Sequence, residues 1–158
     1  RKDIRLAGVL GMAGASVTLN WGGLDKAVGG AALHLRGSHK ALLTEVGEAM
    51  VSGTLQRFQD GVDPEGQPWE PSHRALADGG KTLVDSAALQ NSIAALATAS
   101  AVYVGSNLVY SRIHQEGGKA GRGLKTTIKK RAYLGLSAED MKEIQGVVAD
   151  YLGGAFGG

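Results

Sequence analysis

Apolar and polar residues alternate most clearly in two short parts of the chain. From Ser16 to Asn20, two apolar residues alternate with polar neighbours, a period typical of a strand with one buried face. We predict that this segment starts the sheet. Ser92–Ser100 and Ala101–Val104 have the composition of a strand pair, and we expect Gly105 to close that unit.

Helical spacing dominates the segment from Leu24 to Phe58, where apolar residues recur every three or four positions. A break is expected near Gly37 and Ser38, so one kinked helix or two consecutive helices would fit the pattern. The apolar positions are Leu24, Val28, Ala31, Leu35, Leu42, Val46 and Met50.

A third helix is predicted near the C-terminus. Ser137 and Asp140 have the spacing of a capping box, with aspartate in the place of the usual glutamate. We expect Gly153 and Gly154 to end this helix and Ala155–Gly158 to be a mobile tail. Its apolar stripe consists of Met141, Ile144, Val148, Tyr151 and Leu152.

Two shorter helices complete the pattern. Asp85 or Ser86 can cap a helix that includes Ala87 to Leu89. A second short helix is predicted over Leu108–Gln115, followed by two glycines that end it. This helix would bring three side chains close together. Those side chains are Tyr110, Ile113 and His114. Helices and an antiparallel strand pair without repeated strand-helix alternation predict an α+β fold, a small antiparallel sheet flanked by helices.

Dense turn chemistry marks the segment that ends at Trp69. Gly61 and Gly66 can adopt positive φ, and Asp60 and Asp63 can close Asx turns. These acids lack the alternating oxygen-ligand pattern of an EF-hand, so we expect turn formation and no metal site. Trp69 fits two roles equally well, a core residue or an anchor on a partner surface.

Composition limits the classes of protein. A chain of 158 residues fits one domain, and the absence of cysteine excludes disulfides, thiolate metal sites and thiol nucleophiles. The net charge of +2 gives no overall field for nucleic acid or membranes, and no apolar run is long enough to span a bilayer. We assign residues 1–11 to an extension or alternative start outside the fold, with Met12 as the natural start, and residues 12–158 to the domain. The 25 glycines fit loops and close helix packing, or a protein that orders on assembly.

Basic residues gather in one segment, 117–131, which contains no acidic residue and is predicted to be an extended, exposed basic arm. The arm could contact DNA phosphates, fold against an acidic neighbouring subunit, or simply be solvated. Its glycines are not a phosphate-binding loop, because Leu124 separates Gly123 from Lys125. The cations are Lys119, Arg122, Lys125, Lys129, Lys130 and Arg131.

The four histidines have no spacing typical of metal ligands or of a catalytic dyad. We expect His34 and His39 on a helix surface and His114 packed or hydrogen-bonded. A hydrolase that uses His114 with a nearby carboxylate is the weakest hypothesis, because no nucleophile accompanies it. We therefore predict no catalytic, cofactor-binding or metal-binding residues.

Four segments of the chain occur in a recognisable order: Phe58–Trp69, Leu83–Ile93, Val102–Gly118 and Arg131–Ser137. Taken together, they resemble the phage virion morphogenesis family, the tail completion family of Mu-like phages and prophages. The resemblance covers roughly Val46 to Leu152. Two segments depart from the usual sequence of the family, since Ala87 replaces a glycine and Ala132 replaces a proline at a strand entry.

The resemblance implies a structural protein of the head-to-tail junction, without catalysis or cofactor, that completes the tail or joins it to the filled capsid. It implies a ring, sixfold in that family, with neck, tail-tube or portal-associated proteins as partners. It implies location in the virion and assembly in the host cytoplasm. We expect no membrane partner, and packaged DNA is one candidate contact of the basic arm. Trp69 and the cations of segment 117–131 are the expected contact residues. The competing hypothesis is a small DNA-binding module that acts through residues 119–131.

Overall fold

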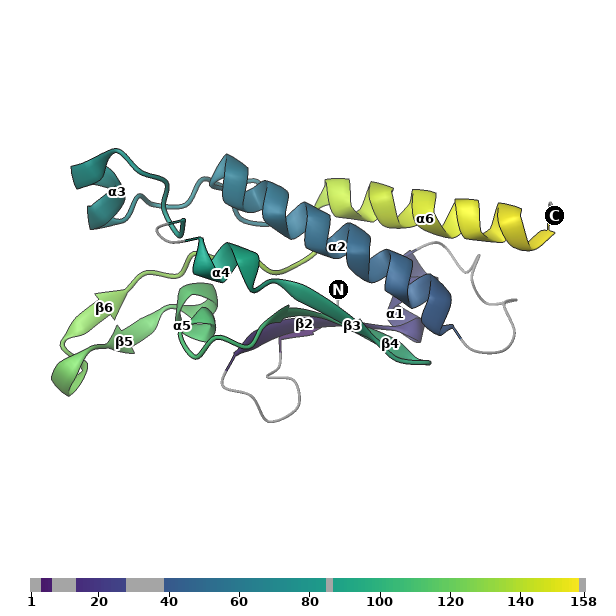
Figure 1. Cartoon of the computed structure of the whole chain (residues 1–158), viewed down its shortest axis with the longest axis horizontal. Coiled ribbons are helices and arrows are strands. Elements are labelled where there is room, and N and C mark those ends of the chain that lie inside the picture. Colours follow the sequence, from purple (N-terminus) through teal and green to yellow (C-terminus); the bar gives the residue numbers. More distant parts are fainter. Residues whose placement is uncertain (1–3, 7–13, 28–38, 85–86, 157–158) are drawn as a thin grey trace.

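A computed structural model describes residues 4–6, 14–27, 39–84 and 87–156. Figure 1 shows a sheet with helix α2 across one face and helix α6 running alongside α2. A small two-stranded hairpin lies at the end of the molecule opposite the C-terminus. Helices and an antiparallel sheet in these layers confirm the predicted α+β class.

The elements follow one another along the chain with short connections. The strands are β1 Ile4–Leu6, β2 Ala15–Asn20, β3 Ala94–Ala97, β4 Ala101–Ser106, β5 Gly118–Ala120 and β6 Thr126–Ile128. The helices are α1 Trp21–Ala27, α2 Lys40–Asp60, α3 His73–Asp78, α4 Ala88–Asn91, α5 Ser111–Glu116, the 3₁₀ turn η1 Arg122–Leu124 and α6 Ala138–Phe156.

The main sheet is antiparallel, with the strand order β1-β2-β4-β3. Its inner face carries apolar side chains of β2 and β4 toward α2, because alternate residues of a strand point to the same side. Val102 is fully buried there, and a Cβ added at Gly47 would lie 2.7 Å from its Cγ2. This glycine lets α2 approach the sheet closely. The buried core includes Val17, Leu19, Leu42, Leu43, Val46, Met50, Phe58, Val104, Tyr133, Ile144 and Val148.

The predicted strands are present, with corrections to their bounds and order. Residues 16–20 lie in β2 but do not start the sheet, because β1 precedes them and pairs with them. The predicted strand pair is present as β3 and β4, although β3 covers only Ala94–Ala97 of the segment Ser92–Ser100. Gly105 does not close the unit, because it pairs with Ser16 on one side and Ala94 on the other, and β4 continues to Ser106. Glycine is needed within this strand, since a Cβ at Gly105 would lie 2.1 Å from the Ala15 carbonyl oxygen.

Residues 1–11, which were predicted to lie outside the fold, contribute strand β1. Ile4 to Leu6 pair antiparallel with Leu19 to Val17, so these three residues extend the sheet. A three-residue strand has too little periodicity to be recognised, and its pairing depends on a tertiary neighbour. The domain therefore includes part of the segment that the sequence analysis set apart.

The long helical segment is present as α1 and α2, and the break expected at Gly37 and Ser38 lies outside the described residues. The cap predicted at Asp85 or Ser86 also lies outside them, and α4 is preceded by Ala87. The strand entry expected at Ala132 is absent, because residues 129–137 have no regular secondary structure.

The capping box of α6 is confirmed in both directions. The amide of Asp140 donates to Ser137 Oγ at 2.9 Å, and the amide of Ser137 donates to Asp140 Oδ2 at 3.0 Å. The predicted end at Gly153 and Gly154 is wrong, since α6 runs to Phe156. Each glycine costs a helix about 1 kcal/mol, but a helix that is already nucleated gains a hydrogen bond with every added residue.

Candidate protein-interaction surfaces

The turn before Trp69 has the predicted geometry at all but one position. Gly61 and Gly66 adopt φ of 69° and 84°, and Asp63 Oδ1 accepts hydrogen bonds from the amides of residues 65 and 67 at 3.0 and 2.8 Å. Asp60 does not close an Asx turn, because it ends α2 and accepts from the Gln56 side chain at 3.0 Å instead. The turn is therefore rigid and fully hydrogen-bonded around Asp63.

Trp69 lies in the core of the subunit, only 8% exposed. Its ring meets Phe58 edge-on at 5.6 Å, and its Nε1 donates to the Ala132 carbonyl oxygen at 2.8 Å. Phe58 also packs against Tyr133 at 5.4 Å. Of the two roles that the sequence left open, the structure places the indole in the core, where it joins the turn to the segment after the hairpin.

Buried polar groups that the sequence analysis did not foresee clamp residues 133–135. Arg57 donates from Nε to the Tyr133 carbonyl oxygen at 2.9 Å and from Nη2 to that of Gly135 at 3.2 Å. Gln115 Oε1 accepts from the amides of Tyr133 and Leu134 at 3.0 and 2.9 Å. Arg57 shares the buried face of α2 with Met50 and Thr54. A charged residue on the apolar face of a helix was the signal in the sequence that could have indicated this buried site.

The predicted basic arm is a β-hairpin rather than a loop. Strands β5 and β6 pair in antiparallel register, and η1 forms the tip, where Leu124 is 64% exposed. Lys119, Arg122, Lys125, Lys129 and Lys130 are all exposed. The hairpin projects at one end of the molecule, so these cations can reach a partner (Figure 1).

Arg131 differs from the other cations of the predicted arm because it is buried. Its Nε donates to the Glu70 carbonyl oxygen at 2.7 Å, and its Nη2 donates to that of Pro71 at 3.5 Å. Its expected exposure is therefore wrong, and it anchors the base of the hairpin to the segment after Trp69. Lys129 pairs with the exposed Glu70 carboxylate, and this hydrogen bond lowers the pKa of Glu70.

His114 lies in a different environment from the surface histidines, on the wall of a cavity of about 310 Å³. Its ring meets Tyr110 edge-on at 6.1 Å, and its buried Nδ1 has no hydrogen-bond partner. Burial lowers the pKa of His114, and the positive charge of Arg131 lowers it further. The described residues that line the cavity include no carboxylate, so they offer no acid to orient His114 as a base.

The other histidines are placed as follows. His39 precedes α2 and stacks on Trp21, with the rings 3.4 Å apart, so it is more than a surface residue. His73 is exposed at the start of α3, and His34 lies outside the described residues. Within the described residues, no three His, Cys, Asp or Glu side chains gather as a metal site. No helix in the described part is long and apolar enough to cross a membrane.

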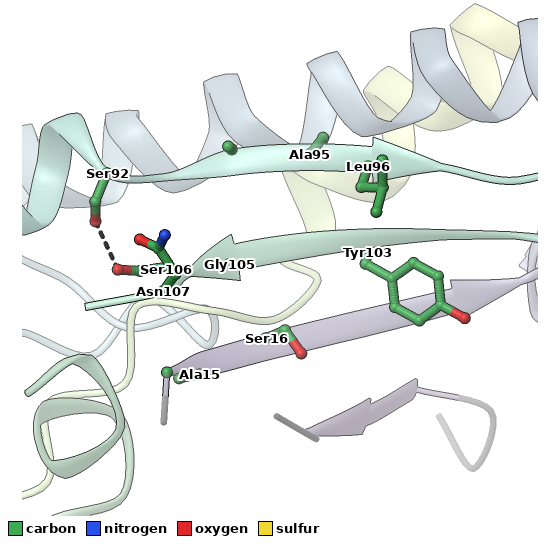
Figure 2. A pocket seen from close by; sticks show the side chains of 11 residues that line it. Ala15, Ser16, Ser92, Ala95, Leu96, Tyr103, Gly105, Ser106 and Asn107 are labelled. Carbon is green, nitrogen blue, oxygen red and sulfur yellow. Dashed lines mark hydrogen bonds between the residues drawn. The ribbon is translucent and has the colours of Figure 1, made fainter. Parts of the chain in front are cut away.

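The sheet face turned away from α2 carries a shallow cavity of about 260 Å³. Figure 2 shows Leu96 and Tyr103 from neighbouring strands at one side of it, and Ser92 and Ser106 joined by a hydrogen bond of 2.6 Å at the other. Leu96 is 50% exposed on the edge strand β3. The β3 edge and the hairpin are therefore two exposed surfaces of the described chain.

Two comparisons relate the chain to known proteins. Residues 19–153, from the end of β2 almost to the end of α6, match the model of the phage virion morphogenesis family. The chain belongs to this family. A relative, Mu-like prophage FluMu G protein 2 of Haemophilus influenzae, is 35% identical over 115 residues, which are 72% of this chain and 79% of that protein. No solved structure matches the chain.

Membership gives the protein a role in phage virion morphogenesis. The family is a structural one. The segments that carried the sequence resemblance lie close together in the fold. Trp69 bonds to Ala132, and Leu89, His114 and Arg131 line one cavity. The segments shared with the family therefore pack against one another inside the subunit, while the hairpin and β3 face outward.

Proposed function

We propose that this protein is a structural subunit of the head-to-tail junction of a Mu-like phage or prophage, where it completes the tail and helps to join it to the capsid. The observation that carries the proposal is the family match over residues 19–153. The proposal makes the protein a virion component that acts by contact and not by catalysis.

Assembly into a ring is the second part of the proposal. A ring needs heterologous contacts, in which one surface of a subunit meets a different surface of the next. The hairpin and the two lysines at its base supply one distinct surface, with five exposed cations and an exposed Leu124 at the tip. The acidic residues exposed on α6, Glu139, Glu143 and Asp150, supply a surface of opposite charge on a separate element. Opposite charges on separate elements favour head-to-tail pairing, and we propose six subunits with neck, tail-tube or portal-associated proteins as neighbours.

Deletion of the gene from an inducible prophage, with plasmid complementation, tests the junction role. We expect separate filled heads and tails in negative-stain images, and joined particles when the wild-type gene is supplied. Light scattering after size-exclusion chromatography, with tail or portal proteins added, tests the ring. Normal joined particles without the gene contradict the junction role, whereas a strict monomer with every such partner contradicts the ring.

Contact through the hairpin has a matched test. Replacement of Lys125 and Lys130 by glutamine should reduce head-tail joining, and replacement of Lys81, an exposed lysine outside both the hairpin and α6, should not. Equal joining by the wild type and both variants would remove the hairpin from the interface.

A DNA-binding module is the second candidate, favoured by the exposure of Lys119, Arg122, Lys125, Lys129 and Lys130 on one hairpin. Contacts to phosphates would make binding fall steeply with salt, by roughly one power of the salt concentration for each neutralised phosphate. Titration of duplex and single-stranded DNA at two salt concentrations measures this slope. Micromolar binding that disappears in the hairpin variants would favour DNA over a protein partner.

A further inference from the structure

Strand β3 forms one edge of the main sheet. It is only four residues long, which limits edge pairing, but its sequence, Ala94 to Ala97, contains neither charge nor proline, and its register with β4 is unbroken. Three of its four residues are exposed, and no strand in the described part of the chain pairs with its outer side. An unprotected edge presents free backbone groups to another strand.

The hydrogen-bond pattern of the hairpin identifies those groups. The amide of Thr98 donates to the Ala101 carbonyl oxygen at 2.8 Å, so these two residues form a hydrogen-bonded pair. Bonded and non-bonded pairs alternate along an antiparallel ladder, so Leu96 is also bonded to β4. The amide and carbonyl groups of Ala95 and Ala97 therefore point outward at the edge.

These two residues flank Leu96 symmetrically, which makes the edge complementary to itself. We propose that β3 pairs antiparallel with β3 of a second copy of this chain, around a two-fold axis at Leu96. Ala95 of one subunit then bonds with Ala97 of the other, and the outward donors and acceptors of both strands are satisfied. The two four-stranded sheets become one continuous sheet.

The side chains around this edge leave room for such a neighbour. Leu96 meets its own counterpart, and the two half-exposed leucines cover each other beside the cavity in Figure 2. On the other face, where α2 packs on β3, residues of both elements line a hollow of about 400 Å³, and most of the lining side chains are small. It consists of Thr44, Glu48, Val51, Ser52, Ala94, Ala95 and Ala97. A two-fold axis normal to the sheet keeps both α2 helices on one side, over this hollow.

The contact is small, so we expect a dimer that forms at micromolar or higher concentration. It is isologous and does not depend on the proposed ring, whose contacts are heterologous. Loss of the dimer with normal head-tail joining would leave the proposed function intact, and the reverse result would leave the dimer intact.

Cysteine cross-linking tests the two-fold axis, because the native chain contains no cysteine. Non-bonded antiparallel pairs hold their Cβ atoms about 4.5 to 5.5 Å apart, close to the reach of a disulfide. Under mild oxidation, Leu96→Cys should form a disulfide-linked dimer about tenfold faster than Leu76→Cys. Leu76 is the matched control because it is 69% exposed on α3, away from the edge. Equal or slower cross-linking at position 96 overturns the proposal.

Amide hydrogen exchange of the unmodified chain tests the register without any substitution. The amide of Leu96 should be protected at every protein concentration, since it bonds within the subunit. The amides of Ala95 and Ala97 should gain protection only as the concentration rises toward the millimolar range. Rapid exchange of both at all concentrations overturns the pairing. Protection without the Leu96 cross-link overturns the two-fold arrangement in favour of a different partner strand.

Discussion

Asp140 Oδ2 lies 2.6 Å from Arg57 Nη1, and both side chains are almost fully buried. The same oxygen accepts the amide of Ser137, so one carboxylate caps α6 and joins it to α2. Arg57 in turn holds the backbone of residues 133–135. This ion pair therefore links the two long helices to the segment that returns from the basic hairpin.

Asp140→Ala should lower the free energy of unfolding by about 3 to 5 kcal/mol, because it leaves the Arg57 guanidinium buried without its counter-charge. Urea denaturation followed by circular dichroism measures the loss. Glu116→Ala removes half of the exposed Arg112–Glu116 pair and should cost no more than about 0.5 kcal/mol. Similar losses in the two variants would contradict the importance of burial.

Gly53→Ala tests how the ion pair is accommodated within α2. Alanine is favoured over glycine in a helix by about 1 kcal/mol, yet a Cβ at position 53 would lie 1.8 Å from Asp140 Oδ1. We expect a net destabilisation of about 1 to 3 kcal/mol, because the carboxylate must move away from Arg57. Gly146→Ala is the control, since nothing lies within 4 Å of its added Cβ, and it should raise stability by about 0.5 to 1 kcal/mol.

Ala87→Gly should raise the stability of the protein. Ala87 has φ of 61° and ψ of 11°, the left-handed region, where a residue with a Cβ costs roughly 1 to 2 kcal/mol. The larger conformational entropy of glycine in the unfolded chain offsets part of that cost. We expect a gain of about 0.5 to 1 kcal/mol in thermal unfolding. Ala88→Gly, at the first residue of α4, should instead lower the stability. A loss of stability in both variants would contradict the backbone strain at Ala87.

Position 87 also shows how the resemblance and the structure fit together. The family usually has glycine there, and in this chain the alanine adopts the left-handed backbone that glycine adopts without strain.

Periodic elements could be predicted from the sequence, because their signals are local. Strand β2, the pair β3 and β4, and the capped helix α6 depend on alternation and on a capping box, which neighbouring residues determine. Strand β1 and the burial of Arg131 depend on distant partners, Leu19 in one case and Glu70 in the other. No local pattern carries that information.

The candidate surfaces were predictable in part for the same reason. The cations of the hairpin form a run of positively charged residues in the sequence. Five of them are exposed, as expected for charged side chains that remain in contact with water. Whether Trp69 faced the core depended on the position of Ala132, sixty-three residues away. The open edge of β3 required the strand order, which periodicity does not supply.

The stability of the protein should fall as the pH drops below 6.5, the ordinary pKa of a histidine side chain, because of His114. Burial lowers the pKa of this ring in the folded state, so the unfolded chain takes up the proton first. His114 therefore contributes stability at neutral pH that is lost on acidification. Urea unfolding at pH 7.5 and 5.5 should show a smaller pH effect in His114→Gln than in the wild type. A pH effect in His114→Gln equal to that of the wild type would contradict the assignment.

Trp69 offers a test of whether a core residue also serves assembly. Trp69→Ala should cost about 3 to 5 kcal/mol, since it removes a buried ring that packs on Phe58. Trp69→Phe keeps an aromatic ring but leaves the Ala132 carbonyl oxygen without its donor, at a cost of about 1 to 3 kcal/mol. If the indole acts only within the subunit, complementation by each variant should fall in proportion to its folded fraction at the growth temperature. Normal folding of Trp69→Phe with lost head-tail joining would instead place the indole in a contact with a partner.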